Sequence, residues 1–431
     1  MKNHPNEIKA AIENTIDEVA EKLRKEGKFQ RMRKLPPETV IRLLISMRGG
    51  GLNKELYDAH VNASPAAFSM RRKLISEKDM EDILETFNDT IKNEKTYEGY
   101  QIFAVDGTSV NLPRNSESKS FVKNAGHPNG LNQLHVTPLF DVLSNIYRYC
   151  VIQPQTTQDE IGALLYMLAW YDFETPTLII GDRGFESYEV IAAFQEKAYA
   201  DYLIRVRQGK NTMREIRKLP EQELDRDLSF YVTTSQTNAA KAADHVIIPK
   251  RKERTFVPPP QFGTKPDFSE KYRIQFRAVR FLLSTGEYET LITSLSRSIT
   301  LAQIKELYRA RWSIETSFRT LKYSIGLTNL HGKRDEFARQ EIYAAMIMSN
   351  FASKIVENIV SQKKKENAYL YAVDMKMAIH LCREFLRTKH ADGDKLLQEF
   401  ARYTEPVRPG RSDVRKLRAK GFVGFVYRVA A

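Results

Sequence analysis

QIFAVDGTSV, residues 101–110, combines a short apolar β-type run with an aspartate, Asp106, that is followed at once by a glycine. The arrangement recurs in TLIIGDRGF, residues 177–185, where the apolar run leads to Asp182. Short apolar runs that end in turn residues are typical of strands buried within a sheet. Each segment therefore predicts a strand that carries a carboxylate at its end.

The segments around these two runs predict a mixed α/β domain. LHVTPLFDV (134–142) and IYRYCVI (146–152) flank a turn-like stretch, which predicts an antiparallel hairpin. Pro138 within the first of them predicts a bulge or an irregular strand. Helices are further expected near 157–171 and 187–198, and another strand at 201–206. Strands that alternate with helices in this way indicate an α/β fold with a mixed sheet.

The first 95 residues have a helical pattern throughout. A short helix at 52–60 is followed by SPAAFSMRRKLI (64–75), in which Ser64 is a good N-cap and Pro65 suits the first helical position. The second helix carries three cations in a row, Arg71, Arg72 and Lys73. Two short helices around a tight turn predict either a DNA-binding helix-turn-helix or an ordinary helical bundle, and the spacing leaves both open.

The second half of the chain divides into a β-rich stretch and a helical one. Residues 209–284 hold three consecutive prolines and β-type runs, whereas residues 301–387 have mainly helical patterns. The tail, 401–431, has eight Lys or Arg against two acidic residues, which predicts either a solvated basic tail or a contact with the DNA backbone.

The composition is that of a globular, basic protein. The chain has 431 residues, is 42% hydrophobic and carries a formal net charge of +13, so it can bury a sizeable core and is suited to a polyanionic partner. Cys150 and Cys382 are far apart and lie in apolar segments, which predicts neither a disulfide framework nor a zinc site. No signal peptide or membrane span is expected, and a cytoplasmic setting fits.

The two strand-end aspartates are candidates for chemistry. In open α/β sheets, sites form at the ends of strands, where a side chain projects into the crevice with little freedom. The alternative for each of Asp106 and Asp182 is a turn-forming aspartate, which is common before glycine.

IKELYRARWSIETSFRTLKYSIGL, residues 304–327, predicts one amphipathic helix that carries a third carboxylate, Glu315. At roughly 100° per residue, one stripe gathers polar side chains and a second gathers the apolar side chains that would pack on the sheet. The members of the polar stripe are Tyr308, Arg311, Glu315, Arg319 and Lys322. The alternative is a surface face with local ion pairs.

These residues resemble the cut-and-paste DDE transposases of bacterial insertion sequences, in the family named after insertion sequence four. The helix is similar to that family's signature, Tyr-x2-Arg-x3-Glu-x6-Lys, at Tyr308, Arg311, Glu315 and Lys322. AVDGT and GDRGF resemble the contexts of the family's first and second acidic residues, and SPAAFSMRRKLI resembles its N-terminal DNA-binding segment.

The resemblance implies an α/β fold with a ribonuclease-H-like catalytic core and a β-rich insertion. An N-terminal helical DNA-binding domain and a C-terminal helical region would complete the chain. The expected limits are 1–95 for the DNA-binding domain, 96–208 and 296–335 for the two parts of the core, 209–295 for the insertion, and 336–431 for the C-terminal region and tail.

The resemblance also implies the chemistry. Asp106, Asp182 and Glu315 would hold two Mg²⁺ or Mn²⁺ ions, because hard oxygen ligands select these cations. The enzyme would cut double-stranded DNA at the inverted-repeat ends of the transposon and join the freed 3′-hydroxyl to target DNA, as a homodimer in the synaptic complex. The expected DNA contacts are Tyr308, Arg311, Arg319, Lys322, Arg183, Arg71, Arg72 and Lys73.

One departure from the family concerns an aromatic residue. Related enzymes stack a flipped base on a tryptophan of the insertion, but the only tryptophans here, Trp170 and Trp312, lie outside residues 209–295. An aromatic side chain of the β-rich stretch could take that role, since any aromatic face stacks a base. The candidates are Tyr231, Phe256, Phe262 and Tyr272.

Three other functions stay open from the sequence. A ribonuclease-H-like nuclease would share the metal site but lack strand transfer. A catalytically silent DNA-binding protein would have no use for the metal site and would not transfer strands. A recombinase that attacks DNA covalently through Tyr308 would leave the carboxylates unexplained. His127, His135 and His331 are expected to be structural residues or phosphate contacts.

Overall fold

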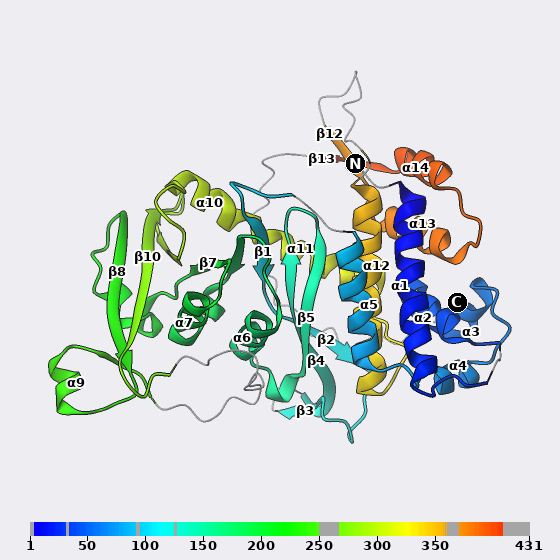
Figure 1. The fold of residues 1–431 in the computed structure, drawn as a ribbon, viewed down its shortest axis with the longest axis horizontal. Coiled ribbons are helices and arrows are strands. Elements are labelled where there is room, and N and C mark those ends of the chain that lie inside the picture. The colour runs from blue at the N-terminus through cyan, green and yellow to red at the C-terminus, as the bar shows by residue number, and fades with distance from the viewer. Residues whose placement is uncertain are drawn as a thin grey trace.

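The structure is a computed structural model that describes residues 4–31, 34–91, 95–124, 127–249, 267–357, 359 and 370–407. A strand-rich region occupies the left of Figure 1 and a helical region the right, where α1 and α5 run beside α12. Most of the predicted basic tail, and Phe256 and Phe262, lie outside the described residues.

The helices are α1 (Pro5–Lys25), α2 (Pro37–Ser46), α3 (Leu52–Asp58), α4 (Pro65–Arg72), α5 (Glu77–Thr90), α6 (Glu160–Trp170), α7 (Tyr188–Glu196), α8 (Arg214–Arg217), α9 (Asn238–Ala242), α10 (Leu301–Ala310), α11 (Trp312–Arg319), α12 (Asp335–Val356), α13 (Met375–Arg387) and α14 (Gly393–Arg402). The strands are β1 (Gln101–Val105), β2 (Thr108–Leu112), β3 (Phe121–Asn124), β4 (His127–Asp141), β5 (Ile146–Pro154), β6 (Thr177–Gly181), β7 (Ala200–Arg205), β8 (Leu224–Thr233), β9 (Val246–Ile247), β10 (Tyr272–Leu282), β11 (Tyr288–Thr293), β12 (Leu370–Val373) and β13 (Thr404–Val407).

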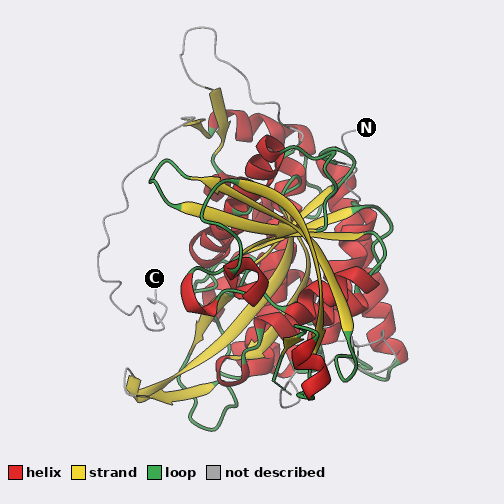
Figure 2. Cartoon of the chain, turned by 90° about the vertical axis from the view of Figure 1, so that its left-hand side faces the viewer, coloured by secondary structure: helices red, strands yellow, loops and turns green. Residues whose placement is uncertain are grey.

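Within the described part of the chain, one large mixed sheet has the order β2-β4-β1-β6-β7-β11-β10-β8-β9, and β3 and β5 also pair with β4. β1 runs parallel to β6 and β6 parallel to β7, whereas β4 is antiparallel to both β1 and β5. The expected hairpin is thus confirmed, and its irregularity falls between Leu139 and Phe140, directly after Pro138. The sheet is strongly twisted (Figure 2).

Alternation along the central strands explains why both faces of the sheet are covered. Phe103 and Ile179 face the cluster built with α6 and α7, whereas Ile102 and Leu178 face the cluster that includes residues of α10. Successive side chains of a strand point to opposite faces, so an apolar run such as that of β1 must be covered on both sides. Each fully buried side chain of this size contributes about 1.5–3 kcal/mol.

The β-rich stretch extends this sheet instead of forming its own. β11 pairs with β7, β10 with β11, and β8 with β10, all antiparallel. The limits of the insertion given above stay a prediction.

The predicted helix over residues 304–327 is wrong as a single regular helix. The chain forms α10, a break at Arg311, α11, and then a π-helical turn, Thr320–Ile325, that ends at Gly326 with φ 102°. A π turn winds more residues per turn than an α-helix, so the 3.6-residue period does not hold from Thr320 on, and Lys322 lies in this segment.

The helical half is organised around α12. This helix packs against α5, α2, α13 and β5, and most of its side chains are buried. No helix in the described ranges is long and apolar enough to cross a membrane. Cys150 and Cys382 are both buried and free.

Candidate active site

Two aspartates lie side by side at one edge of the sheet. Val105 of β1 pairs with Gly181 of β6 in parallel register, so Asp106 and Asp182 follow paired positions. Each carboxylate also shapes its own turn: Oδ1 of Asp106 accepts a hydrogen bond from the Gly107 amide at 2.8 Å. Oδ1 of Asp182 accepts one from the Gly184 amide at 2.7 Å. Asp106 and Asp182 therefore each form a turn and also lie next to each other at the carboxyl ends of neighbouring strands.

Arg311 connects the first aspartate to Glu315. Its guanidinium Nη1 lies 3.6 Å from Oδ2 of Asp106, and its Nη2 donates to Oε1 of Glu315 at 3.1 Å. The Arg311 side chain is only 8% exposed and packs over the rings of Trp312 and Tyr308, at 5.0 and 5.9 Å. A single guanidinium thus joins the end of β1 to the carboxylate of α11.

Burial dominates the electrostatics of Asp106. It raises the pKa of this carboxyl from 3.8 to about 6, opposed by the hydrogen bond from Gly107 and by Arg311 and reinforced by the charges of Asp182 and Glu160. The shift shows that the folded protein stabilises the charged form of Asp106 poorly. A cation at this point would relieve that penalty.

Tyr308 is held as a neutral phenol. Burial raises its pKa to about 12, and its hydroxyl has no hydrogen-bond partner among the described residues. A protonated phenol is a hydrogen-bond donor and a poor nucleophile.

Sequence reasoning did not single out Glu160, and it expected His135, the partner of Glu160, only as a structural residue or a phosphate contact. Glu160 begins α6, and its Oε1 lies 2.9 Å from Nε2 of His135 on β4. An acidic residue in the first turn of a helix is common on any protein, because it complements the helix dipole, so the local sequence gave no reason to single it out. Only the packing of α6 near the ends of β1 and β6 brings Glu160 to the aspartates.

The expected cation ligands are not yet in a closed arrangement. Among the described residues, no group of three or more His, Cys, Asp or Glu side chains is placed so that it could hold a metal ion. Arg311 takes the place between Asp106 and Glu315 that a shared cation would need. The donors themselves, all carboxylate oxygens, are those that hard divalent cations prefer.

The other cations expected to contact DNA have different surroundings. Arg183, directly after Asp182, and Arg319, on α11, are exposed, whereas Lys322 in the π turn is half-buried. Lys73 is exposed and Arg71 half-buried, with its guanidinium 4.4 Å from the centre of the Phe29 ring.

Arg72 does not fit the expectation of a DNA contact. It is 1% exposed, and its guanidinium donates to Gln340, Glu341 and the carbonyl of Phe337, all on α12. The guanidinium therefore ties α4 to α12 and has no surface to offer a phosphate.

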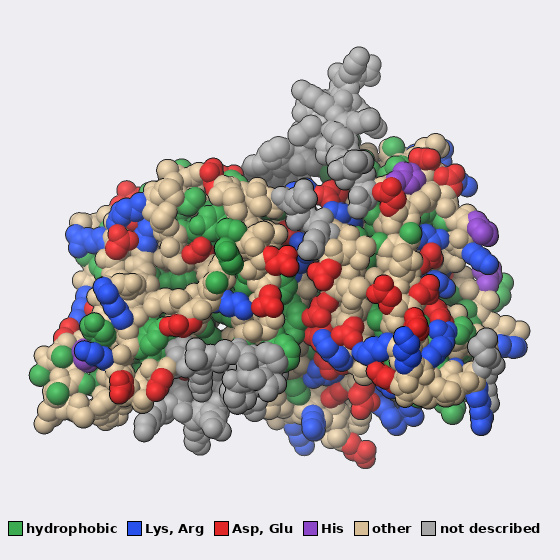
Figure 3. Space-filling view, in the orientation of Figure 1, with side chains coloured by type: hydrophobic (Ala, Val, Ile, Leu, Met, Phe, Trp, Pro, Cys, Tyr) green, Lys and Arg blue, Asp and Glu red, His purple; other side chains and the backbone are tan. Residues whose placement is uncertain are grey.

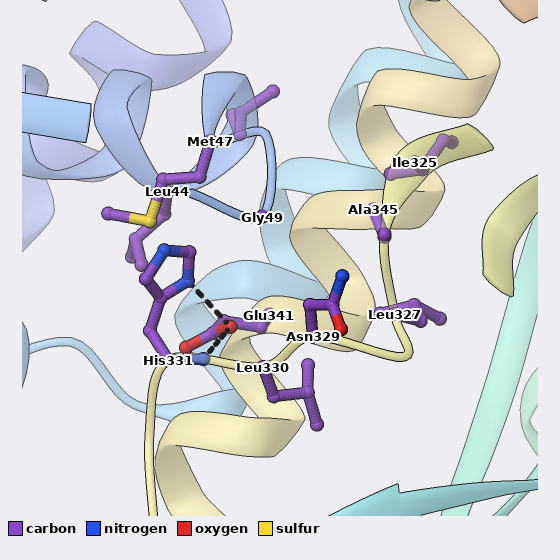
Figure 4. Close-up of a pocket in the computed structure, with 12 residues that line it drawn as sticks. Leu44, Met47, Gly49, Ile325, Leu327, Asn329, Leu330, His331, Glu341 and Ala345 are labelled. Atoms are coloured by element: carbon purple, nitrogen blue, oxygen red, sulfur yellow. Dashed lines mark hydrogen bonds and ion pairs between the residues drawn. The ribbon is translucent and has the colours of Figure 1, made fainter. Parts of the chain in front are cut away.

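Glu341 extends this buried network to His331. The Nδ1 of His331 lies 3.2 Å from Oε2 of Glu341 (Figure 4). The Nε2 of His331 lies 3.1 Å from the carbonyl oxygen of Gly50. The pair borders a cavity of about 30 Å³, which is lined mainly by apolar side chains. His331 is thus a structural residue at the junction of the N-terminal helices and α12.

Comparison with known proteins identifies the family of the chain. The sequence profile of a family described as "Transposase DDE domain" matches residues 97–351, more than half of the 431-residue chain. None of the curated proteins that were compared matches the chain. Among solved structures, the chain is similar to a piggyBac transposase in a synaptic complex with hairpin DNA, with a TM-score of 0.47 and 11% identity over 96% of this chain and 88% of that one. The match over residues 97–351 shows that the chain belongs to the transposase DDE domain family.

Proposed function

We propose that the protein is a metal-dependent cut-and-paste transposase of the insertion-sequence-four type, and that Asp106, Asp182 and Glu315 are its catalytic carboxylates. The observation that carries the proposal is the paired register of β1 and β6, which puts two aspartates at one strand edge, with Glu315 joined to the first of them through Arg311. Membership of the transposase DDE domain family supports it.

The core is proposed to be ribonuclease-H-like. The support is the order of its strands: β5, β4 and β1 are antiparallel neighbours, and β1, β6 and β7 are parallel neighbours. α6 precedes β6 and α7 follows it, so helices connect the parallel strands.

We propose that the site binds two Mg²⁺ or Mn²⁺ ions, on the chemistry of its donors, although the carboxylates are not gathered around one point in the described structure. The donor set is entirely carboxylate oxygen, the half-buried Asp106 has a raised pKa, and the buried hydroxyl of Tyr308 has no partner in the described part of the chain. Such ions supply an activated water and stabilise the oxygen that leaves phosphorus. Asp106, Asp182 and Glu315 would be the residues that hold them.

Arg311 then has a second role. With the carboxylates engaged in holding ions, the Arg311 guanidinium would release at least one of its two carboxylate contacts. Its planar donors are well suited to the phosphate beside the scissile bond. Tyr308, as a neutral donor, and Lys322, Arg319 and Arg183 would bind neighbouring phosphates.

A second cationic region lies beside this edge. A pocket of about 590 Å³ is lined by four Arg or Lys side chains and two Glu side chains: Arg207, Arg214, Arg217, Lys241, Glu186 and Glu189. Arg207 also donates to the carbonyl of Gly184, two residues after Asp182, at 3.2 Å. We propose that DNA passes from the carboxylates toward this pocket, and that Arg71 and Lys73 contact the backbone elsewhere.

The test uses the full-length protein with Mg²⁺ and a labelled duplex that carries the inverted repeat flanking its gene. Nicking at the repeat followed by joined products supports a transposase. Nicking without joining would make the protein a nuclease, and binding without either would make it a silent DNA-binding protein. Strand transfer of two ends by a homodimer predicts paired-end products.

A further inference from the structure

A buried acid–histidine pair lies against the proposed catalytic aspartates. His135 of β4 is 5% exposed, and its Nε2 lies 2.9 Å from Oε1 of Glu160 at the start of α6. Neither His135 nor Glu160 is part of the turns after β1 and β6 or of α11. A carboxylate whose position is fixed by a buried imidazole has little freedom to turn away from what it faces.

What Glu160 faces is defined by two glycines. A Cβ atom on Gly107, directly after Asp106, would lie 2.0 Å from Oε1 of Glu160 and 2.3 Å from Nε2 of His135. A Cβ atom on Gly184 would lie 2.9 Å from Oδ1 of Asp182 and 3.5 Å from Oε2 of Glu160. The two oxygens of one carboxylate therefore reach the turns of both aspartates, and the missing side chains leave the space that admits it.

An independent feature indicates that this edge is built for a ligand. Tyr308 is 7% exposed and its hydroxyl has no partner among the described residues. Its ring centre lies 5.9 Å from the guanidinium of Arg311, which in turn lies 3.6 Å from Asp106. A buried polar group without a partner costs about 1–3 kcal/mol. The cost is removed when an oxygen-bearing ligand, such as a phosphate or a cation-bound water, fills the site.

We propose that Glu160 is a fourth carboxylate of the cation site, and that His135 is the positioning residue that holds it. This inference rests on the proposed function. It adds a ligand from α6, whereas the helical carboxylate already proposed, Glu315, comes from α11. The competing explanation is that Glu160 only complements the dipole of α6.

Cation binding separates the two explanations. Binding of Mn²⁺ alone to the full-length chain is measured by titration calorimetry for the parent, Glu160→Gln, and Glu336→Gln, which removes an exposed first-turn acid of α12. Loss of about tenfold or more in Mn²⁺ affinity for Glu160→Gln, with Glu336→Gln unchanged, supports the proposal. Equal affinities for the parent and Glu160→Gln would overturn it.

The role of His135 is tested by rescue. His135→Ala leaves Glu160 without a donor, whereas His135→Gln can still donate to it. We expect His135→Ala to lose about tenfold in Mn²⁺ affinity and His135→Gln to recover most of that loss. Equal losses for both variants would mean that the imidazole only fills space.

A measurement on the parent protein covers the case in which the variants unfold. Fe²⁺ bound in place of Mg²⁺ generates hydroxyl radicals with peroxide and ascorbate, which cut the backbone next to the metal. The proposal predicts backbone cuts near residues 106–107, 160 and 182–184. Cuts near 106–107 and 182–184 without a cut near 160 would overturn it. If Asp106→Asn and Asp182→Asn also bind Mn²⁺ like the parent, the proposed function fails together with this inference.

Discussion

Asp106 combines a structural role with the catalytic role proposed for it. Its Oδ1 closes the turn after β1, and its Oδ2 faces Arg311. The sequence was sufficient to single out Asp106 and Asp182, because an apolar run that ends in Asp before a turn carries both the strand and the carboxylate. The sequence could not reveal Glu160, because the contact with His135 joins residues 25 positions apart on different elements.

The raised pKa of Asp106 predicts a pH-dependent stability of the metal-free protein. The folded chain holds this proton up to about pH 6, whereas the unfolded chain releases it near pH 3.8. The free energy of unfolding therefore falls as the pH rises from about 4 to about 6, by at most about 3 kcal/mol.

Asp106→Asn removes this titration. In the presence of a chelator, the variant should be more stable than the parent at pH 7 and equal to it at pH 4, as measured by urea unfolding. Added Mg²⁺ should stabilise the parent and leave the variant unchanged. A variant that is less stable than the parent at pH 7 would contradict the assignment.

Removal of a catalytic carboxylate is expected to abolish cutting while the fold is retained. Asp182→Asn and Glu315→Gln should each lower the rate of strand cleavage by on the order of 10³-fold, since groups that act as a unit fail together. Glu336→Gln, which changes an exposed acid at the start of α12, is the control and should cut at the parent's rate. Normal cutting by Glu315→Gln would remove it from the site.

At the scale of elements, α4 shows how a basic run divides between surface and core. Its predicted N-cap, Ser64, is confirmed, because the hydroxyl accepts from the Ala67 amide. The periodicity of so short a helix did not reveal which cation would turn inward, because α12, the partner of Arg72, begins more than 260 residues later.

Two substitutions in this run should have opposite effects. Arg72→Ala leaves Glu341 buried without its cation, which should cost about 3–5 kcal/mol of unfolding free energy. Lys73→Ala should change stability by less than about 0.5 kcal/mol and weaken DNA binding. The measurements are urea unfolding and a DNA-binding titration, and a stable Arg72→Ala protein with lost DNA affinity would reverse the interpretation.

The helix of Glu315 shows what periodicity misses. The apolar positions predicted its packing correctly, since Ile314, Phe318 and Leu321 are buried. The break at Arg311 and the π turn depend on packing against the sheet and against α13, so no regular repeat could have placed Lys322.

At the scale of the molecule, charge is distributed unevenly. The chain carries +13, yet acidic side chains gather over α5 on the face shown in Figure 3. DNA is therefore expected to bind another face, and its affinity should fall about 10³–10⁵-fold between 50 and 200 mM salt for six to ten phosphate contacts. A flat salt dependence in a binding titration would argue against backbone contacts.

The sequence predicted the alternation of strands and helices that makes the mixed sheet, because each element has its own local pattern. It did not predict that β11, β10 and β8 continue the sheet beyond β7. Pairing between distant strands depends on which edge is free after the core has formed, and local patterns do not contain that information.

The central claim is that Asp106, Asp182 and Glu315 meet around divalent cations when DNA is bound. The most direct measurement is the anomalous scattering of Mn²⁺ in crystals of the full-length protein with a duplex transposon end. The account predicts Mn²⁺ peaks at about 2.0–2.3 Å from oxygens of all three carboxylates, with Arg311 moved from at least one of them. A manganese-saturated complex with no peak beside Asp106, or with Glu315 still paired only to Arg311, would contradict it.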